Sequence, residues 1–151
     1  MLITQFKGEF RFLSNFYPCT IRVKGGRTFP SVEHLYQAAK TKDRDRQEGI
    51  RHAPNAGIAK KAGNLVSLRE DWEEIKYDIM QSAVLMKFVQ NSELGQKLIK
   101  TNPAKLIEGN YWHDNYYGNC YCEKCKDIEG QNYLGEILMY VRDLLIKGKQ
   151  D

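Results

Sequence analysis

Three polar residues lie at helical spacing in the segment 31–40. Glu33, Gln37 and Lys40 are separated by four and three positions, so a helix would project them from one side. A carboxylate and an amine on one surface can transfer protons, bind an anionic group or, for the amine, attack an electrophilic carbon. Composition favours a plainer interpretation, a solvated helix face, because Glu and Lys are the commonest exposed helical residues. The functional interpretation therefore needs independent support.

Aromatic rings surround polar side chains in two further segments. Residues 12–18 contain Asn15, whose amide either satisfies nearby backbone groups or faces a pocket with aromatic walls. Residues 111–118 place the carboxylate of Asp114 and the imidazole of His113 among tyrosine and tryptophan rings. Rings interleaved with hydrogen-bonding groups are typical of sites for a nucleobase or nucleotide.

Cysteine is concentrated in one short segment. Cys120, Cys122 and Cys125 fall within six residues, while Cys19 is far away, which does not fit a secreted disulfide framework. With His113 the cluster could supply four zinc ligands, and Cys-x-x-Cys is a true ligand spacing. Because a second well-spaced pair is missing, we expect free reduced thiols, with zinc as the alternative. A nucleophilic cysteine is disfavoured, since only His113 is near enough to act as its base.

The first third of the chain predicts a small sheet. Residues 10–16 are aromatic and partly alternate, which is typical of a strand. Residues 20–23 and 28–29 flank Gly25 and Gly26, which supply the positive φ angles of a tight hairpin.

Helical periodicity follows the sheet. Ser31 is placed to cap a helix that begins at Val32. Further helices are expected at residues 43–51, 55–62 (ending at the C-cap pair Gly63 and Asn64), 71–89, from Ser92, and 133–147 (ending at Gly148), with a strand at 104–108. Residues 109–131 form a long irregular loop, which is more often functional than idle. We expect one α+β domain over 1–151, mostly helical.

Composition excludes several classes of protein. The 151 residues are 42% hydrophobic and 28% charged, an ordinary globular composition. No apolar run approaches the roughly 18 residues of a membrane span, and the first residues lack the apolar centre of a signal peptide. We expect a soluble, cytoplasmic protein with no obligate protein partner. The net charge of +4 permits a polyanionic ligand without requiring one.

Six ordered segments give the chain a specific resemblance to the NADAR (YbiA-like) family. They are FLSNFYP at 12–18, FPSVEHLYQAAK at 29–40, AKKAG at 59–63, DWEEIK at 71–76, KFVQN at 87–91 and GQNYLG at 130–135, leading into Leu138 and Met139. They span nearly the whole chain. The family's late motif usually reads Asp-x-x-Trp-Gly, whereas this chain has Tyr117 between Asp114 and Gly118, and a tyrosine ring can still stack.

The resemblance implies a largely helical α+β fold that hydrolyses an N-glycosidic bond between ribose and a base. The catalytic residues it implies are Glu33, Lys40 and Asp114. The substrate-binding candidates are Asn15, Gln37, Trp72, Tyr117 and Gly118, and for Trp72 a core position is an equal alternative. No metal or redox cofactor is required.

Two substrate classes go with this resemblance: phosphorylated ribosylaminopyrimidine intermediates of riboflavin synthesis, and ADP-ribose attached to guanine in nucleic acid. The absence of a riboflavin-pathway domain and the slight basicity favour the second. Two mechanisms remain open: attack of Lys40 on C1 to give a Schiff base, with Glu33 or Asp114 moving protons, or activation of water by a carboxylate. The alternatives from other classes are a non-catalytic ADP-ribose or nucleotide-binding module and a small zinc-dependent nucleic-acid binder.

Overall fold

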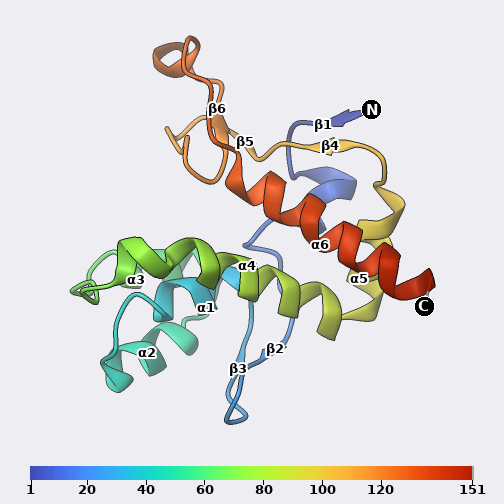
Figure 1. The fold of residues 1–151 in the computed structure, drawn as a ribbon. Coiled ribbons are helices and arrows are strands. Elements are labelled where there is room, and N and C mark those ends of the chain that lie inside the picture. The colour runs from blue at the N-terminus through green and yellow to red at the C-terminus, as the bar shows by residue number, and fades with distance from the viewer. Residues whose placement is uncertain (151) are drawn as a thin grey trace. The chain divides into compact units, whose positions relative to one another are not determined.

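The computed structural model describes residues 1–150, which form two compact units (Figure 1). The N/C unit contains Met1–Ser14 and the chain from Glu93 onward, and the middle unit is Asn15–Ser92. The fold is α+β and mostly helical, as expected, with strands of two residues each. None of the described helices is both long and apolar enough to cross a membrane.

The N/C unit is organised around its terminal helix. Strands β1 (Leu2–Ile3) and β4 (Lys105–Leu106) pair in parallel, and α6 (Tyr133–Gln150) packs along β4. The side chain of Asn132 joins these parts, because its amide donates to the Leu106 carbonyl (2.9 Å) and its oxygen accepts from the Glu108 N–H (2.9 Å). The unit also contains the 3₁₀-helix η1 (Gly8–Leu13) and α5 (Ser92–Lys100), which begins at the unit boundary.

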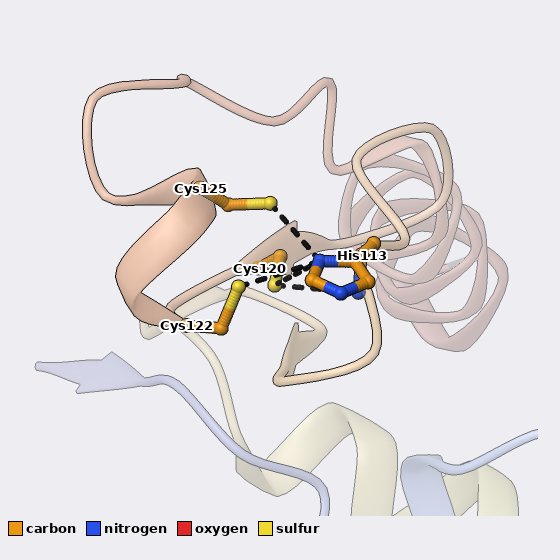
Figure 2. Close-up of side chains that lie close together, drawn as sticks. All are labelled: His113, Cys120, Cys122 and Cys125. Atoms are coloured by element: carbon orange, nitrogen blue, oxygen red, sulfur yellow. Dashed lines mark hydrogen bonds between the residues drawn. The ribbon is translucent and has the colours of Figure 1, made fainter.

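The long loop before α6 has little regular structure. Strands β5 (Gly109–Asn110) and β6 (Asn119–Cys120) pair in parallel, and the 3₁₀-helix η2 spans Glu123–Cys125. The first backbone N–H groups of α6 donate to carbonyls of this loop, Tyr133 to Tyr116 and Leu134 to Tyr117. The loop also carries the cysteine cluster (Figure 2).

Side-chain caps set the starts of three helices in the middle unit. Ser31 caps α1 (Val32–Ala38), Asp43 caps α2 (Arg44–Arg51) and Asn55 caps α3 (Ala56–Gly63), each by accepting from a first-turn N–H. These helices lie where the sequence predicts them. Their shared core contains Phe29, Ala38, Ile50 and Ala59.

The hairpin and the longest helix complete the middle unit. Strands β2 (Ile21–Arg22) and β3 (Thr28–Phe29) are antiparallel, and both Gly25 and Gly26 have φ near +95°, as the turn requires. Helix α4 (Trp72–Gln90) packs on β2 and α1.

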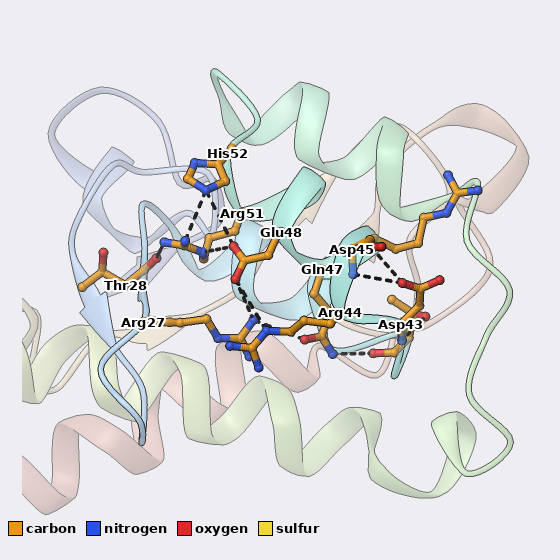
Figure 3. A network of polar contacts seen from close by, with 11 residues as sticks. Arg27, Thr28, Asp43, Arg44, Asp45, Gln47, Glu48, Arg51 and His52 are labelled. Atoms are coloured by element: carbon orange, nitrogen blue, oxygen red, sulfur yellow. Dashed lines mark hydrogen bonds and ion pairs between the residues drawn. The ribbon is translucent and has the colours of Figure 1, made fainter.

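A charged network ties the hairpin to α2 (Figure 3). The Glu48 carboxylate lies 2.6 Å from Nε of Arg51, 3.5 Å from Nη1 of Arg27 and 3.6 Å from Nε of Arg44. The hydrogen bond from Arg51 is the main reason that the pKa of Glu48 is lowered. Arg51 also donates to the Thr28 carbonyl on β3 (3.2 Å).

Three expectations about elements are wrong. Residues 10–16 do not form a strand: residues 8–13 make η1, because local turns satisfy the backbone there and no neighbouring strand is paired with it. Gly148 lies within α6, since a glycine in αR conformation only weakens a helix. Gly63 and Asn64 are not a left-handed cap, because Gly63 is the last residue of α3 and Asn64 is αR.

Candidate functional site

The polar side of α1 is buried. Glu33 is 7% exposed and Gln37 4%, and the Gln37 amide donates a 2.7 Å hydrogen bond to Oε1 of Glu33. A solvated helix face would leave both side chains in water, so that interpretation is wrong. Burying a carboxylate costs free energy unless hydrogen bonds compensate, and the Gln37 amide supplies one.

Lys40 lies just after α1, on the side of the chain that carries Glu33. Its side chain is half-buried, and Nζ lies 5.9 Å from the centre of the Tyr36 ring. Burial lowers the pKa of Lys40; the Glu33 carboxylate opposes this shift and the Lys60 ammonium adds to it. A lysine with a lowered pKa has more neutral amine near neutral pH, which is the form that acts as a nucleophile or base.

An aromatic pair supports this end of α1. The rings of Tyr36 and Trp72 meet edge to face with centroids 5.0 Å apart. Trp72 is only 4% exposed, so it takes the core position that the sequence left open, with its ring against Tyr36. A contact between Trp72 and substrate stays a prediction.

Asn15 contacts α1 through its backbone rather than its side chain. Its carbonyl accepts the Glu33 N–H (3.1 Å), one of the free donors of the first helical turn. Its amide donates to Sδ of Met80 on α4 (3.4 Å), and the residue is half-buried. Asn15 therefore fixes the position of Glu33.

Buried hydrogen bonds hold α1 in place. Nε2 of His34 lies 3.1 Å from the Ala53 carbonyl, which can only accept, so Nε2 carries the proton. Nδ1 lies 2.7 Å from the Ser31 hydroxyl, and burial lowers the pKa of His34, which favours the neutral ring with Nδ1 as acceptor. His34 is thus a structural residue.

A glycine on α3 makes room for the site. A Cβ at Gly63 would lie 2.7 Å from Cβ of Gln37 and closer still to its Oε1. Only glycine allows α3 and α1 to approach this closely. The sequence shows Gly63 as a helix end and gives no sign of this contact.

Asp114, Tyr117 and Gly118 belong to the N/C unit, whereas the α1 residues belong to the middle unit. Oδ1 of Asp114 accepts the N–H groups of Tyr116 (3.0 Å) and Tyr117 (2.9 Å), which makes a tight turn. The rings of these two tyrosines meet edge to face, 4.7 Å apart. A Cβ at Gly118 would collide with Glu108, so glycine is required there. Of the site residues predicted from the sequence, the structure brings Glu33, Gln37 and Lys40 together, on α1 or just after it.

Two lysines in the middle unit were not singled out from the sequence. Lys60 on α3 is exposed, near enough to Lys40 to lower its pKa, with Nζ 6.0 Å from the Phe16 ring. Lys87 on α4 is 1% exposed, and burial lowers its pKa to about 7. Its spacing from Ala83 and Val84, both buried, places it on the inner face of the helix, a signal that helical periodicity could have revealed.

His113, Cys120, Cys122 and Cys125, the four zinc candidates of the sequence, are brought together by the loop of the N/C unit. Cys19 lies in the middle unit, where the Lys87 ammonium partly offsets the rise in its pKa caused by burial. All four cysteines carry free thiols.

Comparisons with known proteins identify one protein family over nearly the whole chain. The model of the NADAR domain family matches residues 4–146. The N-glycosidase YbiA of Escherichia coli (strain K12) is 37% identical over 138 residues, covering 87% of this chain and 79% of YbiA. The NMR structure of E. coli YbiA superposes with a TM-score of 0.83 at 33% identity, covering 100% of this chain and 90% of that one.

A relative with an additional region carries a different name. A riboflavin biosynthesis protein of Vibrio vulnificus (strain YJ016) is 38% identical over 136 residues, which is 89% of this chain. The match spans only 35% of that protein, so this chain corresponds to about a third of it.

Proposed function

This chain belongs to the NADAR family, and from that premise we propose that it is an N-glycosidase, a hydrolase that cleaves the bond between a ribose and a nitrogenous base. The observation that carries the proposal is the buried arrangement on α1, in which Gln37 orients the carboxylate of Glu33 beside the amine of Lys40. The names of the relatives, N-glycosidases at 37% identity, support the same reaction class.

The chemistry of the reaction matches these groups. Breaking the C1–N bond builds positive charge on the ribose and negative charge on the departing base. A carboxylate near C1 stabilises the first, and a proton donor near the base neutralises the second. Glu33 supplies a carboxyl group and Lys40 an amine, and Asp114 is a second candidate for proton transfer.

In the covalent route, the neutral Nζ of Lys40 attacks C1 and the C1–N bond to the base breaks, with a carboxylic acid protonating the base. The carboxylate left behind takes a proton from Nζ and passes it to the ring oxygen, which leaves C1 as the sugar opens and gives a protonated imine between C1 and Nζ. Water adds to the imine and restores the free amine and the free sugar. The lowered pKa of Lys40 favours this route over direct activation of water by Glu33.

We propose ADP-ribose on guanine in nucleic acid as the substrate, so that the enzyme reverses an ADP-ribosylation. The support is the second cation, Lys60, near Lys40, because two amines at the edge of the site suit a ribose that carries phosphate. The exposed ring of Phe16 beside Lys60 offers a stacking surface for a base. The pyrimidine intermediates of riboflavin synthesis are the second candidate, favoured by the name of the Vibrio relative.

The proposal is tested with two substrates in parallel: a DNA oligonucleotide carrying ADP-ribose on guanine, and a ribosylaminopyrimidine phosphate, with products followed by mass spectrometry. Glu33→Gln is the inactive comparison. Glu74→Gln, an exposed carboxylate on α4 of the same unit, is the matched control.

Release of ADP-ribose and unmodified DNA by wild type and Glu74→Gln, but not by Glu33→Gln, is the expected result. Cleavage of the ribosylaminopyrimidine phosphate alone would overturn the proposal that ADP-ribosylated guanine is the substrate, and would still support the N-glycosidase reaction. Binding of ADP-ribose without cleavage of either substrate would overturn both and favour a binding module.

A further inference from the structure

Four soft or borderline metal ligands meet in the loop before α6 (Figure 2). Their ligand atoms are Nδ1 of His113 and the Sγ atoms of Cys120, Cys122 and Cys125, and all four lie within 4.8 Å of one another. Cys120 and Cys125 are buried, Cys122 is half-buried and His113 is exposed. None of these four residues takes part in the proposed glycosidase reaction.

The distances fit a tetrahedral metal. With Zn–S of about 2.3 Å and Zn–N of about 2.0–2.1 Å, the ligand atoms of such a site lie about 3.5–3.8 Å apart. Nδ1 of His113 lies 3.3 Å from Sγ of Cys122, 3.4 Å from that of Cys125 and 4.0 Å from that of Cys120. Sub-ångström adjustments would bring all three to the ideal values.

The backbone directs these atoms to one centre. His113 has a φ of +69°, a left-handed conformation that non-glycine residues rarely adopt, and its N–H donates to Sγ of Cys120 (3.3 Å). Cys122 and Cys125 are held one turn apart by η2, where the Cys125 N–H donates to the Cys122 carbonyl (3.0 Å). Asn115 Oδ1 accepts the Cys120 N–H (2.8 Å) and so holds β6.

We propose that His113, Cys120, Cys122 and Cys125 form a structural zinc site. Three thiolates and an imidazole are a ligand set that zinc prefers, and here their ligand atoms lie within 4.8 Å of one another. A disulfide would use only two of the three sulfurs and would leave the imidazole without a role. Four protein ligands leave no open position for a reacting water, so the site is structural rather than catalytic.

The zinc ion cross-links a loop that has little regular secondary structure. Between Gly109 and α6 the regular structure is limited to the two-residue strands β5 and β6 and to η2. Asp114 follows the ligand His113 directly, and its carboxylate holds the next turn. Coordination at His113 therefore fixes the conformation from which Asp114 makes this turn.

The test is the metal content of the purified, tag-free full chain, measured by plasma mass spectrometry after growth with added zinc. We compare wild type with Cys122→Ser and His113→Ala, which each remove one ligand, and with Cys19→Ser, which removes a cysteine outside the cluster. We expect one zinc per chain in wild type and Cys19→Ser, and well below one in the two ligand variants.

A second measurement guards against variants that fail to fold. Hydrogen exchange of the wild-type chain is compared before and after chelation, and again after zinc is restored. We expect faster exchange confined to residues 109–130 on chelation, reversed by zinc. Iron instead of zinc, no stoichiometric metal in wild type, or zinc retained in both ligand variants would each overturn the proposal.

Discussion

The side-chain amide of Gln37 donates a 2.7 Å hydrogen bond to Oε1 of Glu33, one turn earlier on α1. The other end of the amide, Oε1, is buried and has no hydrogen-bond partner within the described part of the chain. Turning the amide over would place this oxygen against the carboxylate. The carboxylate and the amide therefore fix each other's orientation, and the unpaired amide oxygen of Gln37 is the cost of this arrangement.

Gly63→Ala tests whether this pair needs the close approach of α3. The new Cβ would lie 2.7 Å from Cβ of Gln37, so the helices must move apart or Gln37 must leave Glu33. We expect a loss of about 1–3 kcal/mol in the free energy of unfolding, measured in urea, together with reduced turnover.

Gly57→Ala is the matched control for that experiment. It lies on the same helix, and its Cβ would meet only Oδ1 of Asn55, at an ordinary 3.4 Å. This variant should be neutral or more stable by up to about 1 kcal/mol. If the two variants change the free energy of unfolding equally, the effect of Gly63 is limited to helix propensity and its contact with Gln37 does not matter.

Glu33→Gln separates a chemical role of the carboxylate from a structural one. The amide has the same size and keeps an oxygen that can accept from Gln37, so we expect an unchanged melting temperature. Loss of a general acid or base should lower turnover by about 10²–10⁴-fold. If the melting temperature falls while each folded molecule turns over as fast as wild type, Glu33 has a structural role instead.

Local sequence signals predicted most elements of the fold. Ser31 was predicted to cap its helix, and the helices expected from Asp43 and Asn55 begin at those residues, because each of these side chains bonds to an N–H two or three residues away. The spacing of Glu33, Gln37 and Lys40 likewise identified one helix face. The burial of that face was not predictable, because it depends on α3 and α4 packing around α1.

The features that the sequence did not predict correctly also depend on contacts between elements that are distant in the chain. A partly alternating aromatic pattern at residues 10–16 is compatible with a strand, but a strand needs a partner, and β4 pairs with β1 instead. The contact of Gly63 with Gln37 is between two helices, so it produces no periodic pattern in the sequence. The zinc candidates were visible as residue types, and only the folded loop brings His113 to the cysteines.

The pH dependence of turnover tests the nucleophile. Burial lowers the pKa of Lys40 below its ordinary 10.5, and the attacking form is the neutral amine. The covalent route also needs a protonated carboxyl group to supply the base with a proton, so turnover should rise and then fall with pH. Sodium borohydride added during turnover should reduce the imine and attach the sugar to Lys40, detected by peptide mass.

Lys40→Arg is the decisive variant for that mechanism, because arginine keeps the positive charge and cannot form the imine. We expect loss of both turnover and borohydride adduct. Lys61→Arg, on an exposed lysine of α3, should retain both. Near-normal turnover of Lys40→Arg would exclude the covalent route and leave activation of water by a carboxylate.

Lys87 makes stability depend on pH. Burial lowers its pKa from 10.5 to about 7, with Nζ lying 4.9 Å from the Phe88 ring centre and attracted by Cys19. Between these two values the unfolded chain binds a proton that the folded chain does not, so the free energy of unfolding rises with pH over this window. Below about 7 both states are protonated, and the full cost of burying the charge is present.

Lys87→Met keeps an unbranched side chain, one atom shorter than lysine, and removes the titrating group. We expect the variant to be more stable than wild type near pH 7, by about 1–4 kcal/mol, with the difference shrinking toward about pH 10. Urea unfolding at several pH values measures both curves, and Lys147→Met, on an exposed lysine of α6, should follow wild type. If Lys87→Met is instead less stable at every pH, the ammonium is held by partners that outweigh its burial, and Lys87 is part of a polar network that the fold requires.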